Sequence, residues 1–369
     1  MSDPRLPRVV MATARFWPEL GGVETHVREL GIRLAARGIE ITVAATDRSG
    51  RLPAHEVVDG LTVRRFPAYP VNLDLYLAPR LGRFVAHSGA DLVHVQGFHT
   101  LVAPMAMFAA LSAGLPYVVS LHTGGHSSPL RNAVRPLQAR LLIPFIRRAG
   151  AVICGSRWEA GYVGRQLGLE PERIAIIPSG VDVAGLSPEE AGQPDPDLVV
   201  SPGRLEQYKG HHRVVEAFPL ILARRPNARL RLLGDGPAEA TLREQADRAG
   251  IGDRVIIGPV HGRGAAARVM AGAAVVVSMS DYESQGIAIH EAAALGRPTV
   301  VANATALGEL VDVGAARGVP LDAPAGALAD AVVAAMDSPA PTPFPATTWD
   351  ESATMVAELY GRVLAASRT

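Results

Sequence analysis

The sequence predicts an α/β protein made of two Rossmann-like, doubly wound lobes. Short runs of β-branched residues alternate with helical patterns along the chain. This alternation stops once, in a stretch rich in proline, glycine and acidic residues, and then starts again. A chain of 369 residues is also too long for one core of ordinary size, which favours two domains.

The first lobe is expected over residues 1–182. A helix from about Val23 to Arg37 follows its first strand. The segment Leu101–Leu121 is apolar enough to suggest a membrane-spanning helix as an alternative. However, Gly114 and Pro116 divide it into a helix and a buried strand, which we favour. The strands expected in this lobe are 8–14, 39–45, 91–95, 117–121, 150–156 and 173–178.

The second lobe is expected over residues 198–345, after a hinge at 183–197. A second proline-rich break precedes a last helix, in which Met355, Leu359 and Val363 are spaced as an apolar stripe. We expect this helix, within residues 346–369, to cross back and pack on the first lobe. The strands expected in the second lobe are 198–203, 229–236, 254–259, 273–280 and 298–303.

The composition restricts the class of partner and the compartment. Basic and acidic residues balance at 36 each, which argues against a broad nucleic-acid surface. The single cysteine, Cys154, cannot form an internal disulfide, and the first residues lack a secretory pattern, so we expect a cytoplasmic protein. The abundance of arginine, alanine and proline suggests a bacterial source. Arginines among Leu and Phe at 131–148 leave peripheral contact with the inner membrane face as an alternative.

The only lysine of the chain stands among 35 arginines. Lys209 and Arg204 follow the strand at 198–203, and Lys209 is expected to open a helix. Ligands of doubly wound sheets bind at the carboxyl ends of strands. Two cations beside a helix N-terminus predict a phosphate site there, since the helix end presents unpaired N–H groups. The alternative is that Lys209 is a solvated surface charge.

Two carboxylates follow a later strand of the second lobe. Glu283 lies in a loop, and Glu291 lies in a helix that begins near Gly286 or Ile287. This helix start predicts a second anion cradle. Because carboxylates repel phosphate, we expect Glu283 and Glu291 to accept hydrogen bonds from sugar or ribose hydroxyls. The alternative is that Glu283 caps the helix and Glu291 faces solvent.

The first lobe carries weaker signals at its strand ends. Gly21 and Gly22 form a turn after the first strand, where a backbone can approach a ligand closely. His99 and His122 follow two neighbouring strands, although a single histidine is more often structural. The chain has no Walker loop, no G-x-G-x-x-G after a strand and no zinc-binding pattern. We therefore expect neither a metal nor a tightly bound cofactor.

Six motifs in order carry a family resemblance. They are "PELGGVE", "SLHTGG", "PSGVD", "GRLEQYKG", "LLGDGP" and the Glu283 to Glu291 pair. The chain resembles the retaining, nucleotide-sugar-dependent glycosyltransferases of the GT-B fold, the group often called family four. This resemblance implies an N-terminal acceptor lobe, a C-terminal donor lobe and a cleft between them.

The resemblance also implies roles for the donor-binding residues. Arg204 and Lys209 would hold the donor diphosphate. Gly21 and Gly22 would close over it from the first lobe. Glu283 would bind hydroxyls of the transferred sugar, and the backbone of Gln285, Gly286 and Ile287 would help to bind the phosphate and the sugar. Glu291 would bind the ribose hydroxyls.

On the acceptor side, the resemblance places His122 beside the anomeric carbon, with His99 and Thr123 near the acceptor. Two positions depart from the family pattern. Ser179 replaces the usual Asn of Asn-Gly-Val-Asp, and Gln285 replaces an aromatic residue near the donor sugar. Gln285 therefore leaves the identity of the sugar open.

The resulting hypothesis is a retaining glycosyltransferase. It would move a sugar from a nucleoside-diphosphate sugar, expected to be a UDP sugar, to a hydroxyl acceptor without a metal. The residues expected to act in catalysis are His122, Glu283, Arg204 and Lys209. Two alternatives remain: a nucleotide-sugar epimerase of the same architecture, and a non-catalytic partner that only binds a nucleotide sugar.

Overall fold

The computed structural model describes residues 6–19, 21–71, 76–97, 100–123, 140–181, 183, 193–261 and 264–367. These residues form two compact units, each with its own sheet. Unit 1 comprises residues 6–123, 140–179 and 348–367, and unit 2 comprises residues 180–347, with the gaps just given.

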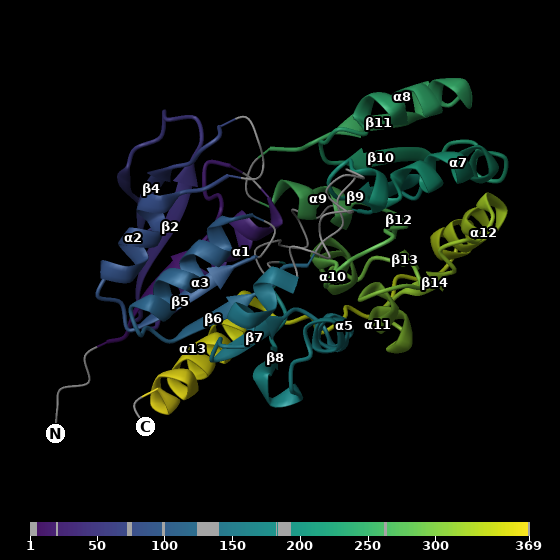
Figure 1. Ribbon diagram of the computed structural model, residues 1–369. Coiled ribbons are helices and arrows are strands. Elements are labelled where there is room, and N and C mark those ends of the chain that lie inside the picture. Colours follow the sequence, from purple (N-terminus) through teal and green to yellow (C-terminus); the bar gives the residue numbers. More distant parts are fainter. Residues whose placement is uncertain are drawn as a thin grey trace. The chain divides into compact units, whose positions relative to one another are not determined.

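Unit 1 is built on an eight-stranded sheet in the order β3-β4-β2-β1-β5-β6-β7-β8 (Figure 1). All neighbouring strands are parallel except β3 and β4, which form an antiparallel hairpin. The strands are β1 (Arg8–Ala12), β2 (Glu40–Asp47), β3 (His55–Val58), β4 (Leu61–Pro67), β5 (Leu92–Gln96), β6 (Tyr117–Ser120), β7 (Ala151–Cys154) and β8 (Ile174–Ile176).

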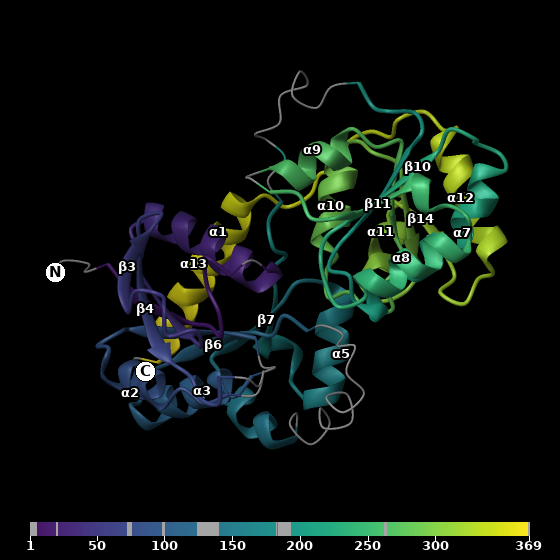
Figure 2. The same cartoon turned by 90° about the horizontal axis from the view of Figure 1, so that it is seen from above.

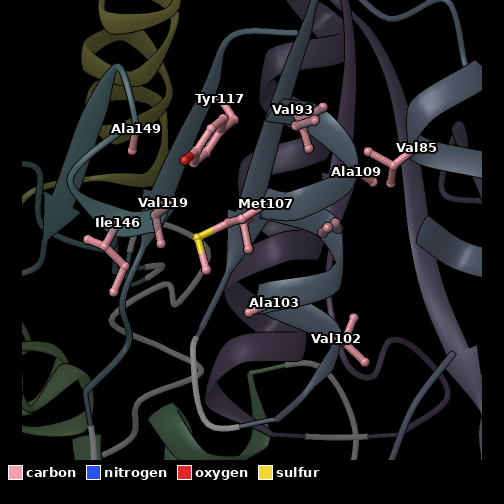
Figure 3. Packing of buried hydrophobic residues seen from close by; sticks show 14 of the residues in the cluster. Val85, Val93, Val102, Ala103, Met107, Ala109, Tyr117, Val119, Ile146 and Ala149 are labelled. Atoms are coloured by element: carbon pink, nitrogen blue, oxygen red, sulfur yellow. The ribbon is translucent and has the colours of Figure 1, made fainter. Parts of the chain in front are cut away.

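Helices cover both faces of this sheet, so its central strands are buried on both sides. Val9 and Met11 of β1 belong to one core, and Val10 and Ala12 belong to the other. The side chains of a strand alternate between faces, so the buried part of β1, Val9–Ala12, is apolar throughout, while Arg8 at its start is only partly buried. Figure 3 shows one core, where Met107 approaches residues of the sheet.

The helices of unit 1 divide between the two cores. One core takes residues from α2 (Pro79–His87), α3 (Val102–Ser112) and α5 (Arg157–Leu167). The other takes residues from α1 (Gly22–Ala36) and α13 (Trp349–Ala366). A single turn of 3-10 helix, η1, spans Pro171–Arg173.

The last helix packs on unit 1, as the sequence predicts, although its buried face is rotated from the expected stripe. Leu359 and Val363 are buried, but Met355 is only partly buried. The helix also buries polar and aromatic residues that the stripe did not include. The buried residues of α13 are Trp349, Ser352, Ala353, Val356, Leu359, Tyr360 and Val363.

Unit 2 is built on a fully parallel six-stranded sheet in the order β11-β10-β9-β12-β13-β14. The order reverses between β9 and β12, which is where doubly wound sheets bind ligands. The strands are β9 (Leu198–Pro202), β10 (Arg229–Leu233), β11 (Val255–Gly258), β12 (Val275–Ser278), β13 (Thr299–Ala302) and β14 (Arg317–Val319).

The helices of unit 2 cover the two faces of its sheet (Figure 2). One face is covered by α7 (His211–Leu222), α8 (Glu239–Arg248) and α12 (Ala325–Met336). The other is covered by α9 (Ala265–Ala271), α10 (Ile287–Ala294) and α11 (Leu307–Asp312). Short 3-10 turns occur at η2 (Gln207–Lys209) and η3 (Gly252–Arg254).

The structure confirms the doubly wound lobes and each strand predicted above. It adds three strands, β3, β4 and β14. The β3-β4 hairpin turns at Asp59 and Gly60, both with positive φ. An Asp-Gly pair is a common hairpin signal, and the sequence reading did not use it. The apolar segment 101–121 forms α3 and β6. Of the helices that the structure describes, none is both long and apolar enough to span a bilayer.

Candidate functional site

The predicted phosphate site lies in the loop that joins β9 to α7. Arg204 lies two residues after the end of β9, in the loop that follows the strand, as expected. Lys209 does not open the helix: it is the last residue of η2, and α7 begins two residues later. The intervening residue, Gly210, has a left-handed backbone (φ +71°) that L side chains disfavour. The chain therefore turns sharply between Lys209 and the helix.

Gly210 also lets this loop touch the end of β12. A Cβ atom at this position would lie 1.8 Å from the carbonyl oxygen of Met279. The same carbonyl accepts a hydrogen bond from Arg213 (3.0 Å). The backbone N–H of Asp281 donates to the carbonyl of Tyr208 (2.8 Å). The loops after the two central strands are thus fastened together.

This contact places Lys209 against Glu283. The Nζ of Lys209 lies 2.7 Å from Oε1 of Glu283, and the buried hydroxyl of Ser280 donates to the same oxygen (2.8 Å). Their side chains are only 17% and 16% exposed. Burial lowers the pKa of Lys209, but the Glu283 carboxylate and Tyr208 together outweigh that effect and leave the pKa above its ordinary value. The lysine is therefore a fixed cation.

The loop that carries Glu283 leads into α10. The N–H of Glu283 donates to the hydroxyl of Thr305 (3.1 Å), which fixes the loop backbone. Gly286 caps α10 with φ +79°, and a Cβ atom there would lie 2.6 Å from Leu307. The helix α10 therefore begins four residues after Glu283, at Ile287.

The other predicted residues of this loop are found where the sequence places them. Gln285 is buried, and Ile287 is the first residue of α10. Glu291 is partly buried in the second turn of the helix.

Arg204 is held through its backbone by a buried histidine. Nε2 of His211 donates to the carbonyl of Arg204 (3.2 Å), and Nδ1 accepts from Ser201 (2.9 Å). Burial lowers the pKa of His211 to about 4, so the ring is neutral near pH 7. The guanidinium of Arg204 is half-exposed and pairs with Glu206 at 3.3 Å.

This arrangement can bind a phosphate group. It combines a fixed ammonium, a guanidinium in the same loop and a helix N-terminus close to Glu283. An ammonium has three N–H groups, and its bond to Glu283 uses one of them.

Unit 1 carries a second polar group at the carboxyl ends of β5 and β6. Gln96 is the last residue of β5, and His122 follows β6 with a left-handed φ of +46°. Nε2 of His122 donates to Oε1 of Gln96 (2.7 Å). The ring of His26, from α1, lies 4.5 Å from the ring of His122 between centroids, in an edge arrangement.

Two histidines beneath this group are buried and neutral. His94 bonds to Tyr360 of α13 through Nδ1 (2.6 Å) and to Ser120 through Nε2 (2.8 Å). Nδ1 of His26 bonds to Ser179 (2.9 Å). Burial, together with a smaller effect of a neighbouring histidine, lowers the pKa of His26 and of His94 to about 3.

The predicted residue Thr123 is tied to a buried carboxylate. Glu159 accepts from the N–H of Thr123 (3.0 Å), from its hydroxyl, and from the N–H of Gly155 (2.7 Å). Burial raises the pKa of Glu159 and outweighs these hydrogen bonds, which lower it. Glu159 thus fixes the segment that follows His122.

The structure shows few contacts for the remaining predicted residues of unit 1. Gly21 caps α1 in an extended conformation, and a Cβ atom at Gly22 would meet nothing within 4 Å. His99 lies outside the described residues.

The structure therefore brings the predicted residues together in two groups, one in each unit. Unit 2 joins Lys209 to Glu283, and unit 1 joins His122 to Gln96 and His26. The sequence reading missed five residues that complete these groups: His26, Gln96, Glu159, His211 and Ser280. Gln96 and Ser280 could have been found, because each is a polar residue at or just after the end of a buried strand.

Comparison with protein families gives two matches that together cover most of the chain. The model of glycosyltransferase family 4 matches residues 20–184. The model of glycosyl transferases group 1 matches residues 185–346.

Several curated proteins are similar over most of their length. A D-inositol 3-phosphate glycosyltransferase of Nocardiopsis dassonvillei is 29% identical over 317 residues, which cover 77% of this chain and 74% of that protein. A D-inositol 3-phosphate glycosyltransferase of Xylanimonas cellulosilytica is 29% identical over 376 residues, covering 89% and 86%.

Solved structures confirm the GT-B architecture. Sucrose-phosphate synthase from Thermosynechococcus elongatus superposes with a TM-score of 0.78 at 21% identity, covering 98% of this chain and all of that one. The Anabaena protein HepE, solved with UDP and glucose, superposes with a TM-score of 0.71 at 20% identity, covering 98% and 97%.

Proposed function

Because the chain belongs to the family 4 glycosyltransferases, which use nucleotide-sugar donors, we propose that it transfers a hexose from a UDP sugar to a hydroxyl acceptor with retention. The observation that carries this proposal is the ion pair of Lys209 and Glu283 where the sheet order of unit 2 reverses.

In this proposal the main chemical task of unit 2 is to stabilise the departing diphosphate. Negative charge grows on the leaving phosphate as the bond to the sugar breaks. The ammonium of Lys209, the backbone that carries Arg204 and the N-terminus of α10 are fixed before the reaction, which makes such stabilisation effective. A metal ion is then not required for this step.

The retaining outcome assigns the acceptor proton to the leaving phosphate. In a front-side displacement, the phosphate oxygen that leaves takes the proton of the attacking hydroxyl, so no strong base of the protein is needed. Glu283 orients Lys209 and accepts from hydroxyls of the transferred sugar. His122 lies beside the reacting carbon and binds the acceptor side.

The choice of UDP and of a polyol acceptor is supported by similar proteins. HepE was solved with UDP and glucose, and the Nocardiopsis relative is named for D-inositol 3-phosphate. UDP-glucose and D-inositol 3-phosphate are therefore the first donor and acceptor to test. The melting temperature of the protein should rise more with UDP-glucose than with GDP, ADP or TDP sugars.

The decisive experiment is transfer by a Lys209→Ala variant. We expect kcat to fall about 100-fold, since a large electrostatic contact to a transition state is worth about 3 kcal/mol. Turnover of UDP-glucose is measured with and without EDTA, and the configuration of the product is read by NMR. Unchanged turnover in a folded Lys209→Ala protein would contradict the proposal.

Arg224→Ala is the matched control in the same unit. Arg224 pairs with Asp330 across two exposed side chains, so its removal also deletes one cation from an ion pair. We expect turnover within twofold of the wild type. An equal loss in both variants would indicate a general electrostatic effect rather than a phosphate contact.

A further inference from the structure

Two buried nitrogen atoms beside His122 lack a hydrogen-bond partner among the described residues. They are Nε2 of His26 and Nε2 of Gln96. The two residues are only 5% and 4% exposed. An unsatisfied buried polar atom costs about 1–3 kcal/mol and is uncommon in native proteins, so each calls for an explanation.

Both atoms belong to side chains that touch the same ring. Oε1 of Gln96 accepts a hydrogen bond from Nε2 of His122 at 2.7 Å. The unsatisfied nitrogen, Nε2, belongs to the same planar amide group as this oxygen. The ring of His26 lies 4.5 Å from that of His122 between centroids. The two unsatisfied atoms therefore adjoin His122 from β5 and from α1.

The hydrogen-bonding types of these atoms are complementary. The amide nitrogen of Gln96 is a donor. His26 can carry its proton on Nδ1 and donate a hydrogen bond to Ser179, which leaves Nε2 as an acceptor. A hydroxyl group both accepts and donates one hydrogen bond, and so matches this pair.

The charges around the two atoms favour a neutral group over an anion. Burial keeps His26 and His94 neutral, with each pKa near 3, and the amide of Gln96 carries no charge. On the neighbouring helix α5, the carboxylate of Glu159 accepts from Thr123, the residue after His122.

We propose that Gln96 and His26 form, with His122, a binding subsite for one sugar-type hydroxyl group. Nε2 of Gln96 donates a hydrogen bond to the hydroxyl oxygen, and Nε2 of His26 accepts a hydrogen bond from the hydroxyl group. This inference rests on the proposed function and deepens it, because it assigns hydroxyl recognition to two residues outside the family motifs. The hydroxyl belongs to the acceptor or to the transferred sugar.

Two variants remove the atoms separately. His26→Asn deletes Nε2, while the asparagine amide can still reach Ser179. Gln96→Leu deletes the amide at similar volume and serves as the second variant if the first fails to fold. His87→Asn is the matched control, since His87 is an exposed histidine of α2 that bonds to the carbonyl of Arg83 (2.9 Å).

The experiment measures binding of UDP and UDP-glucose, and turnover of UDP-glucose with water alone and with D-inositol 3-phosphate. We expect turnover to fall about 10-fold in each variant, with UDP affinity unchanged and His87→Asn within twofold of wild type. A parallel loss of UDP-glucose affinity assigns the hydroxyl to the transferred sugar. Unchanged UDP-glucose affinity assigns it to the acceptor.

The two hypotheses fail in different ways. A wild-type protein that neither binds nor turns over UDP-glucose contradicts the proposed function. A wild-type protein that does both, with folded His26→Asn and Gln96→Leu proteins that match it in binding and turnover, overturns the hydroxyl subsite alone.

Discussion

A single glycine decides how closely two loops of unit 2 approach. Gly210 has both a left-handed backbone and a carbonyl oxygen 1.8 Å from the position of an added Cβ atom. That oxygen is part of the main chain at the end of β12 and cannot rotate away as a side chain would. Any other residue must therefore separate the loop of Lys209 from the loop of Glu283.

Gly210→Ala should consequently lower both stability and donor binding. We expect a loss of about 2–4 kcal/mol in the free energy of unfolding, from the left-handed backbone together with the steric clash. Denaturant unfolding and UDP-glucose titration measure the two effects.

Gly250→Ala separates the two causes. Gly250 also has a positive φ (+69°), but a Cβ atom there would meet nothing within 4 Å. We expect only about 1 kcal/mol of destabilisation and unchanged donor binding. A Gly210→Ala protein as stable as Gly250→Ala would refute the close contact between the loops.

At the scale of residues, the sequence predicts which side chains are functional candidates better than it predicts which of them contact each other. Lys209 and Glu283 are both recognisable because each follows a strand. Their contact is not predictable, since it depends on the Gly210 turn that joins segments about 70 positions apart. His26 was missed for the same reason: its significance comes from His122, which lies close only in the folded chain. Gln96 was recognisable by its place at the end of a buried strand, but its contact with His122 was not.

Among the secondary-structure elements, α13 has the most clearly defined start. The hydroxyl of Thr348 accepts from the N–H of Glu351 (3.2 Å), and the carboxylate of Glu351 accepts from the N–H of Thr348 (2.8 Å). This reciprocal pair is a capping box, which satisfies two N–H groups that the helix leaves unpaired.

Thr348→Ala should destabilise unit 1 by about 1 kcal/mol, because it removes the hydroxyl that caps the first turn. Thermal unfolding of the variant measures this loss. Ser367→Ala is the control at the other end of the helix, where the serine hydroxyl donates to the exposed carbonyl of Leu364 (2.9 Å). Equal melting temperatures for the wild type and Thr348→Ala would show that the cap contributes nothing.

Helices and strands with a strong hydrophobic pattern are predicted well from the sequence, and those with a weak pattern are not. The expected helix at Val23–Arg37 is α1, which spans Gly22–Ala36. By contrast, β3 is the edge strand and β4 lies next to it, and both mix charged or polar with apolar residues, so no continuous apolar run marks them. The rotation of α13 was missed because its buried face includes Ser352 and Tyr360, which a search for apolar residues passes over.

On the scale of the whole molecule, the two units differ in how the chain builds them. Unit 2 is a continuous stretch from Gly180 to Thr347 among the described residues, and both of its cores lie within that stretch. Unit 1 needs a distant segment, because α13 supplies part of one of its two cores.

Removing residues 348–369 should therefore abolish the folding of unit 1 and spare unit 2. Trp349, Leu359, Tyr360 and Val363 are buried, and burying each large apolar side chain stabilises by about 1.5–3 kcal/mol. Their sum is comparable to the whole stability of a domain, about 5–15 kcal/mol. Calorimetry should show only the transition of unit 2.

A chain that ends at Ala366 is the control, because it keeps the whole of α13. It should show both transitions at the temperatures of the full protein. If the protein that lacks residues 348–369 also kept both transitions, the core between α1 and α13 would be dispensable.

The distant position of α13 has a consequence for protein synthesis. All described residues of unit 2 leave the ribosome before Thr348 does, whereas unit 1 waits for α13, which follows unit 2 in the chain. We expect unit 2 to mature first and unit 1 to remain exposed to chaperones until α13 has been released, the reverse of the usual order in which domains are made.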